Sequence, residues 1–204
     1  MTEVKICGIT NLEDATMAVD FGADALGFVF YKKSPRYLEQ DTAKKIAASL
    51  PSSVITVGLF VNEESSKIRE TMECCNLQAI QFHGDESPEF CGQFKDQKII
   101  KAIRLLDRDS LKKINNYQVC AVLLDAYSKD SYGGTGESFD WKILTKLDTR
   151  SNLILAGGLT PENVREAIRI VNPYAVDVSS GVEKKPGKKD LKKLEEFIKV
   201  VKFL

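Results

Sequence analysis

The sequence is poor in the residues and segments on which several classes of protein depend. It contains one histidine, His83, and none of its five cysteines are spaced as Cys-x-x-Cys, so no metal site is expected. Basic and acidic residues number 29 each, which argues against a nucleic-acid partner because such proteins usually carry a basic excess. The longest apolar runs are only a few residues, too short to cross a membrane, so no membrane partner is expected either.

Targeting and linker segments are equally scarce. The opening residues, MTEVK, contain no apolar signal region, so we expect the protein to be cytoplasmic. No low-complexity or linker stretch divides the 204 residues, and we expect a single domain over residues 1–204. Cys74, Cys75 and Cys120 lie in or beside apolar segments and are expected to be small buried hydrophobic residues.

What the sequence does contain is a repeated alternation of short apolar runs and helix-like segments. Each run is four to eight residues long, the length of a buried strand. The runs are residues 4–7, 25–30, 54–61, 77–82, 98–103, 119–125, 152–156 and 174–179.

The intervening segments carry apolar residues at helical spacing, most clearly in 12–19 and 191–201. Thr10 followed by Glu13 predicts a capping box at the start of the first helix. Thr160 followed by proline predicts another helix start after the seventh strand.

Nearly continuous apolar strands that alternate with helices predict a parallel sheet covered by helices. Eight such units favour an α/β fold, a single-domain (β/α)8 TIM barrel with eight parallel strands. An open doubly wound sheet is the alternative, but it would usually have a glycine-rich turn after the first strand, which ICGIT does not supply.

Polar residues follow several of the predicted strands, at the barrel end where active sites lie. Cys7 ends the first strand, His83 follows the fourth and Asp125 ends the sixth. Apolar surroundings would favour the protonated form of Asp125. Strand alternation places Lys5 on the same face as Cys7, so we expect Lys5 to pair with Asp177 inside the barrel and to favour the Cys7 thiolate.

Glycine and serine residues follow strands seven and eight, where barrels of this type often bind phosphate through backbone N–H groups. These candidates are Gly157, Gly158, Ser180 and Gly181. Arg36, after the second strand, is a candidate for holding a substrate carboxylate. Residues 132–141 lie mostly in the longest connection and are interpreted as a loop over the site. The lysines of 183–193 are interpreted as a solvated face.

The motifs KICGIT, SPR, FHGDE, LLDA, GGTG, LAGGL and DVSSGVE, in this order and spacing, closely resemble the phosphoribosylanthranilate isomerase family of tryptophan biosynthesis. The resemblance covers residues 4 to about 184, and its one visible departure is Phe82, where leucine is more usual. It implies a cofactor-free Amadori rearrangement of a small phosphosugar, N-(5-phosphoribosyl)anthranilate, to an aminoketose.

The same resemblance implies roles for individual residues. Cys7 would be the general base and Asp125 the general acid, while Arg36 would hold the anthranilate carboxylate. The phosphate would lie on Gly157, Gly158, Ser180 and Gly181. We also assign His83 and Asp177 to substrate binding, and we expect a monomer or a homodimer.

Two other functions stay open at this point. A histidine-pathway aldose–ketose isomerase of the same barrel type would more naturally use two aspartates, and Cys7 argues against it. A catalytically silent phosphate-binding barrel that serves as a partner subunit is the other, and the presence of both Cys7 and Asp125 argues against that one.

Overall fold

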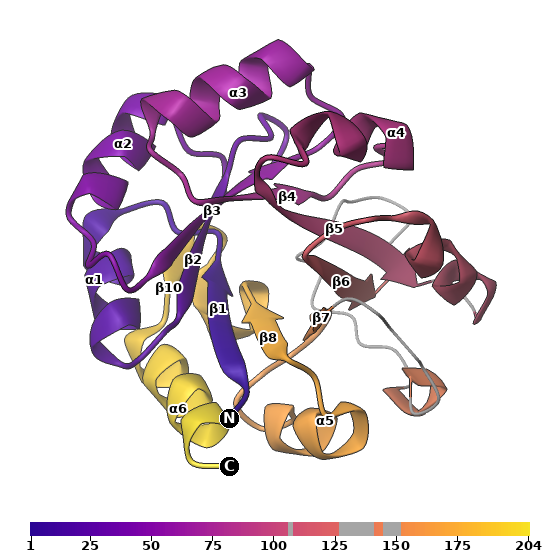
Figure 1. The fold of residues 1–204 in the computed structure, drawn as a ribbon. Helices are drawn as coiled ribbons and strands as arrows, with labels where there is room; N and C mark the ends of the chain where they lie inside the picture. The colour runs from indigo at the N-terminus through magenta and orange to yellow at the C-terminus, as the bar shows by residue number, and fades with distance from the viewer. Residues whose placement is uncertain (106–107, 127–140, 145–151) are drawn as a thin grey trace.

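Eight parallel strands close into a barrel in the computed structural model, which describes residues 1–105, 108–126, 141–144 and 152–204 (Figure 1). Each strand pairs with its neighbours in sequence, and β1 closes the barrel against β8. The strands are β1 (Glu3–Cys7), β2 (Ala25–Val29), β3 (Ile55–Phe60), β4 (Ala79–Phe82), β5 (Lys98–Leu105), β6 (Ala121–Ala126), β7 (Asn152–Leu155) and β8 (Ala175–Val178). All eight predicted strands are therefore present, and closure excludes the open doubly wound sheet.

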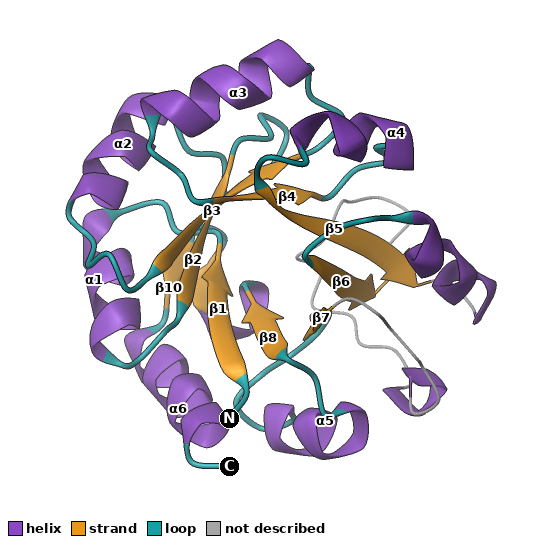
Figure 2. Ribbon diagram, viewed as in Figure 1, coloured by secondary structure: helices purple, strands orange, loops and turns teal. Residues whose placement is uncertain are grey.

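Helices connect the strands on the outside of the barrel (Figure 2). The α-helices are α1 (Leu12–Asp20), α2 (Gln40–Ala48), α3 (Ser65–Cys74), α4 (Pro88–Cys91), α5 (Val164–Val171) and α6 (Leu191–Lys202). In the described parts of the connections there are also 3-10 helices: η1 (Gly92–Phe94), η2 (Arg108–Asn116), η3 (Trp141–Leu144) and η4 (Ser180–Val182). Among the described residues, no helix has the length and apolar character that a membrane span requires.

Alternation along each strand divides the core into two parts. Along β1, Val4 and Ile6 face the helices, where they are fully buried in the main apolar cluster. Lys5 and Cys7 face the barrel interior, and the strand register places Lys5 directly opposite Asp177. Complete burial of an isoleucine such as Ile6 contributes about 1.5–3 kcal/mol, so this alternation strongly specifies the register.

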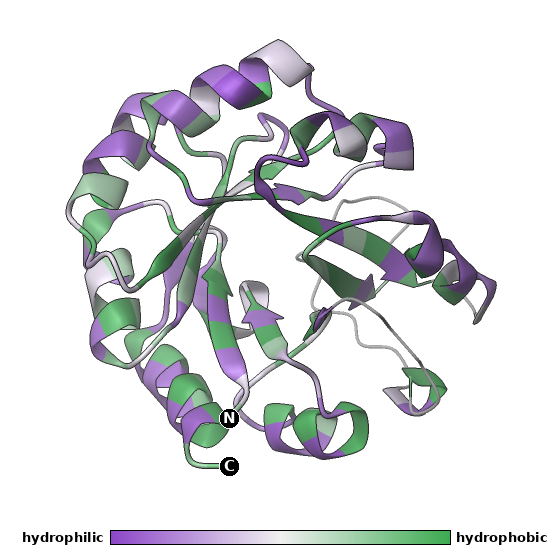
Figure 3. Ribbon diagram, viewed as in Figure 1, coloured by the Kyte–Doolittle hydropathy of each residue, from purple (hydrophilic) through white to green (hydrophobic). Residues whose placement is uncertain are grey.

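The helices contribute to this core through one face only. Figure 3 shows hydrophobic and hydrophilic residues in alternating bands along them, as the 3.6-residue period requires. In α6, Leu194, Ile198 and Val201 are buried, which confirms the predicted C-terminal helix.

Both predicted helix starts are displaced along the chain. The cap of α1 is Asn11, whose Oδ1 accepts from the backbone N–H of Asp14 at 2.9 Å, because the hydroxyl of Thr10 donates instead to the carbonyl of Gly187. The helix α5 begins at Val164, since Thr160 is followed by a turn in which the Asn163 side chain accepts from the Thr160 N–H at 2.8 Å.

A short antiparallel hairpin lies between η4 and α6. It consists of β9 (Glu183–Lys185) and β10 (Lys188–Lys189). The fully buried carboxylate of Asp14, in α1, accepts from the backbone N–H of Lys189 and from the ammonium of Lys188, both at 2.8 Å. These hydrogen bonds attach the hairpin to the start of α1, beside the end of β1.

Candidate active site

A cleft opens at the carboxyl ends of the barrel strands, and its wall contains every residue predicted for the site. These are Cys7, Arg36, His83, Asp125, Gly157, Gly158, Asp177, Ser180 and Gly181. They come from six different strands or the loops after them, so only closure of the barrel brings them together. In the described part of the chain, no three histidine, cysteine, aspartate or glutamate side chains are grouped as metal ligands would be.

Cys7 lies at the end of β1, buried beside two charged residues. The Nζ atom of Lys5 is 2.8 Å from Oδ1 of Asp177, which confirms the predicted pair. Burial raises the pKa of the Cys7 thiol above its ordinary value, and the positive charge of Lys5 only partly offsets this. The predicted influence of Lys5 is confirmed, because its charge and hydrogen bond lower the Cys7 pKa, but loss of hydration is the larger effect and the pKa lies above its ordinary value.

Gly8 turns the chain sharply after Cys7. Its φ is +76°, a conformation that side chains rarely adopt, and a Cβ atom there would lie 2.6 Å from Cδ of Arg36. Glycine at this position therefore lets the Arg36 side chain pass directly over the end of β1.

Asp125, the residue before the last of the buried strand β6, is the last member of a hydrogen-bonded chain of side chains. Nε2 of His83 lies 3.2 Å from Oδ2 of Asp125, and Nδ1 of His83 lies 2.9 Å from Nε2 of Gln81. Because an amide N–H only donates, this arrangement makes Nδ1 the acceptor, and the proton of a neutral His83 then lies on Nε2, facing Asp125. Gln81, which lies two residues earlier on the same face of β4, thus orients His83.

The FHGDE motif fixes His83 through the loop after β4. The buried carboxylate of Glu86 accepts from the backbone N–H groups of Asn62 at 2.8 Å and Gly84 at 3.0 Å. The ammonium of Lys101, also buried, donates to Glu86 Oε2 and to the Gly84 carbonyl, both at 2.8 Å. These hydrogen bonds hold the loop after β4 in place, and Glu86 is the carboxylate with which the buried Lys101 pairs.

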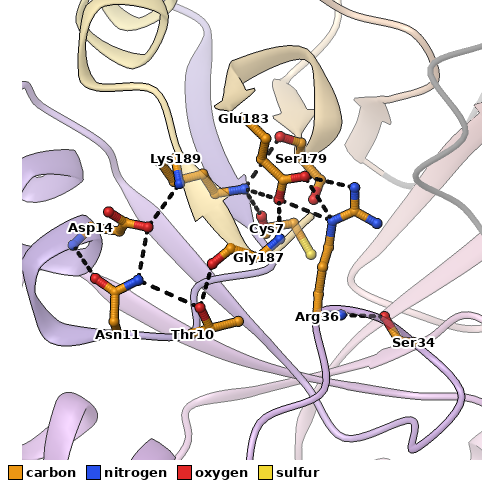
Figure 4. Close-up of polar contacts among 10 residues, drawn as sticks. All are labelled: Cys7, Thr10, Asn11, Asp14, Ser34, Arg36, Ser179, Glu183, Gly187 and Lys189. Carbon is orange, nitrogen blue, oxygen red and sulfur yellow. Dashed lines mark hydrogen bonds and ion pairs between the residues drawn. The ribbon is translucent and has the colours of Figure 1, made fainter. Parts of the chain in front are cut away.

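Arg36 enters the cleft already bound to a carboxylate. Its Nε and Nη2 atoms donate to Oε1 and Oε2 of Glu183 at 3.0 Å and 2.7 Å (Figure 4). The Glu183 pKa is lowered: burial alone would raise it, but the hydrogen bonds and charges of Arg36 and Lys189 outweigh that effect. Glu183 is therefore ionised at neutral pH.

Backbone groups dominate the part of the cleft after β7 and β8. Gly157 and Gly158 have positive φ angles, and a Cβ at Gly181 would overlap the carbonyl of Leu159, so this loop packs directly on backbone. The buried hydroxyl oxygen of Ser179 has no hydrogen-bond partner within the described residues. This is a wall of small residues with polar groups available to a ligand.

Two interpretations from the sequence are corrected by burial. Lys189 is fully buried, not part of a solvated face, because its ammonium donates to the carbonyls of Cys7 at 2.6 Å and Ser179 at 3.2 Å and to Glu183 Oε1 at 3.0 Å. Of the three cysteines expected to be buried, Cys75 is buried, Cys74 is only partly buried and Cys120, one residue before β6 begins, is exposed. The predicted loop over the site, 132–141, lies outside the described residues except for Trp141.

Comparison with known proteins decides among the open functions. The family model described as N-(5'phosphoribosyl)anthranilate (PRA) isomerase matches residues 4–200. The chain belongs to the phosphoribosylanthranilate isomerase family. It is thus an isomerase of tryptophan biosynthesis that converts N-(5-phosphoribosyl)anthranilate to 1-(2-carboxyphenylamino)-1-deoxyribulose 5-phosphate.

Individual family members are similar over their full lengths. An N-(5'-phosphoribosyl)anthranilate isomerase from Geobacter metallireducens is 54% identical over 202 residues, which cover 99% of this chain and 100% of that protein. The crystal structure of phosphoribosyl anthranilate isomerase from Thermotoga maritima has a TM-score of 0.94 at 45% identity, with 100% of both chains covered. A structure of such an isomerase in complex with reduced 1-(o-carboxyphenylamino)-1-deoxyribulose 5-phosphate has a TM-score of 0.91 at 45% identity, again with 100% of both chains covered.

Proposed function

We propose that Cys7 is the general base and Asp125 the general acid of the isomerisation. The observation that carries this assignment is that one cleft contains both groups together with a guanidinium and two small-residue loops. The substrate has matching parts: a carboxylate on the aryl ring, a phosphate at the other end and the reacting carbons between them.

We assign the substrate-binding residues by matching the carboxylate and the phosphate of the substrate to groups in the cleft wall. The edge of Arg36 that Glu183 leaves free binds the anthranilate carboxylate, and Gly157, Gly158, Ser180 and Gly181 hold the phosphate. His83 and Asp177, which also line the cleft, bind the substrate as well. The ligand named in the homologous complex, a reduced aminoketose phosphate, carries the same carboxylate and phosphate groups.

The reaction then needs several proton transfers, of which the first two are assigned to Asp125 and Cys7. Asp125 protonates the ring oxygen as the bond between C1′ and that oxygen breaks, and the nitrogen lone pair forms the C1′=N bond of an iminium ion. Cys7 removes the proton from C2′, and the C–H electrons form the C1′=C2′ bond of an enolamine while the nitrogen regains its lone pair. Protonation at C1′ and loss of the C2′ hydroxyl proton give the ketone. Positioned acids and bases each typically contribute 10²–10⁴-fold, by order of magnitude.

The test is to measure kcat of the Cys7→Ser and Asp125→Asn proteins with substrate generated in situ from anthranilate and phosphoribosyl pyrophosphate. Each substitution removes the acid or base, so we expect a loss of about 10²–10⁴ in kcat. Thermal stability should change little, because each substitution keeps the side chain's size. Activity is followed as loss of the anthranilate-type fluorescence. Near wild-type kcat in either variant would contradict the role assigned to that residue.

We further propose that residues 1–204 act as one catalytic domain in the cytoplasm. The single family model that matches residues 4–200 supports one domain, and the biosynthetic role of the family supports the location. The protein works as a monomer or a homodimer, and light scattering at assay concentrations distinguishes the two.

A further inference from the structure

The β9–β10 hairpin contributes two buried charged residues, Glu183 and Lys189, that contact residues of the cleft wall and that the proton transfers do not use. Glu183 is 8% exposed and Lys189 is 0% exposed. Burying a charge is costly unless it is paired and hydrogen-bonded. Every hydrogen-bond partner of these two side chains lies at the active-site end of the barrel (Figure 4). The partners are the Arg36 guanidinium, the backbone carbonyls of Cys7 and Ser179, and the hairpin itself.

Glu183 occupies one particular edge of the Arg36 guanidinium. The carboxylate accepts from Nε and Nη2, the side-on edge, at 3.0 Å and 2.7 Å. Figure 4 shows the remaining terminal nitrogen of Arg36 pointing away from Glu183. A guanidinium can make two-fold contacts along both edges, so this arrangement leaves the end-on edge for a second carboxylate.

Lys189 sets the charge of the cluster. Arg36 and Glu183 alone would cancel, and a neutral pair would attract a substrate carboxylate weakly. Burial lowers the pKa of Lys189, but its Nζ contacts three acceptors, the carbonyls of Cys7 and Ser179 and Oε1 of Glu183, and only the ammonium form has three N–H groups to donate. The three charged groups then sum to one positive charge in a largely desolvated place. Electrostatic attraction is stronger there than in water.

We propose that Glu183 and Lys189 are positioning residues that make the site selective for a substrate carboxylate. Glu183 fixes the guanidinium of Arg36 with its end-on edge toward the cleft, and Lys189 keeps the cluster cationic. This inference rests on the proposed carboxylate-binding role of Arg36. It defines the favoured ligand class as aryl aminoketose phosphates with a carboxylate ortho to the nitrogen.

The test compares two ligands in calorimetry: reduced 1-(o-carboxyphenylamino)-1-deoxyribulose 5-phosphate and its phenylamino counterpart without the carboxylate. Glu183→Gln should weaken binding of the carboxylated ligand by about tenfold or more and of the other by less than about twofold. With the natural substrate, KM should rise by a similar factor while kcat changes little, because the contact exists in ground and transition states alike. In an Arg36→Ala background, Glu183→Gln should add no further effect.

Lys189→Met provides a second variant in case Glu183→Gln does not fold, since it retains the Arg36–Glu183 pair. It should also weaken only the carboxylated ligand. Glu13→Gln is the matched control, because it removes an exposed partner of Lys188 on the same hairpin and leaves Asp14 in place. This control should leave both affinities unchanged.

The outcomes separate the two proposals. If Arg36→Ala weakens only the carboxylated ligand but the hairpin variants weaken neither, or weaken both ligands equally, the positioning role is overturned and the role of Arg36 survives. If Arg36→Ala itself treats both ligands alike, the carboxylate contact of Arg36 is wrong and the positioning role falls with it.

Discussion

Cys7 is the residue at which burial and charge oppose each other most directly. Burial raises the pKa of its thiol, and the Lys5 ammonium is the largest influence that lowers it. The pKa of Lys5 is in turn raised, because Asp177 and Cys7 outweigh the loss of hydration, so Lys5 remains charged at neutral pH. A base must be deprotonated to act, and Lys5 therefore helps determine how much of the enzyme is active at a given pH.

Lys5→Met should consequently raise the thiol pKa further. At neutral pH we expect kcat to fall by about tenfold or more, with activity recovering as pH increases, because one unit of pKa corresponds to a tenfold change in the thiolate fraction. The pH profile of kcat measures this. Lys5→Arg keeps the charge and serves as the control, and its profile should stay close to that of the wild type. An unshifted profile in Lys5→Met would mean that Lys5 serves only to neutralise Asp177.

At the scale of elements, the β9–β10 hairpin depends on ionised carboxylates. Asp14 and Glu183 both have lowered pKa values: burial alone would raise them, but hydrogen bonds and charges from Lys188, Lys189 and Arg36 prevail. A carboxyl group whose pKa is lower in the folded than in the unfolded protein stabilises the fold above its unfolded value. These values are 3.8 for Asp14 and 4.5 for Glu183, and the stabilisation is lost as pH falls below them.

Asp14→Asn should therefore lower the free energy of unfolding by roughly 1.5–3 kcal/mol at pH 7, the usual worth of a hydrogen bond to a charged group. The difference from wild type should begin to shrink as pH falls below 3.8, where the carboxyl of the unfolded wild type becomes protonated, and it should be lost below the lower pKa of the folded protein. Urea unfolding at pH 7 and at pH 3 measures both values. A difference as large at pH 3 as at pH 7 would show that Asp14 stabilises the hairpin through shape rather than charge.

At the scale of the whole molecule, the architecture was largely predictable from the sequence. Few folds other than a helix-covered parallel sheet accommodate continuous apolar strands between amphipathic helices. The two-residue alternation of side chains along a strand also correctly predicted the pairing of Lys5 with Asp177. Every candidate site residue was chosen because it lies at or after the end of a predicted strand, and every one of them lines the same cleft. The chemical roles of these residues stay predictions.

What the sequence did not predict depends on contacts distant along the chain. Lys189 reads as one lysine in a charged run, and only the barrel places the carbonyls of Cys7 and Ser179 beside its ammonium. Similarly, the Thr10 hydroxyl bonds to Gly187, far away in sequence, which shifts the helix cap to Asn11. Local patterns describe strands and helices well, but they do not show which polar groups a folded barrel brings within hydrogen-bonding distance.

The central claim, that Asp125 opens the sugar ring and Cys7 then takes the C2′ proton, is tested most directly by an isotope effect. Turnover of substrate deuterated at C2′ is compared with turnover of unlabelled substrate in the Cys7→Ser and Asp125→Asn proteins. In Cys7→Ser, proton abstraction becomes the slowest step, so the account predicts a large primary isotope effect on kcat. In Asp125→Asn, ring opening becomes the slowest step, and the two substrates should turn over at equal rates. The same isotope effect in both variants, or a large effect in Asp125→Asn alone, would contradict the account.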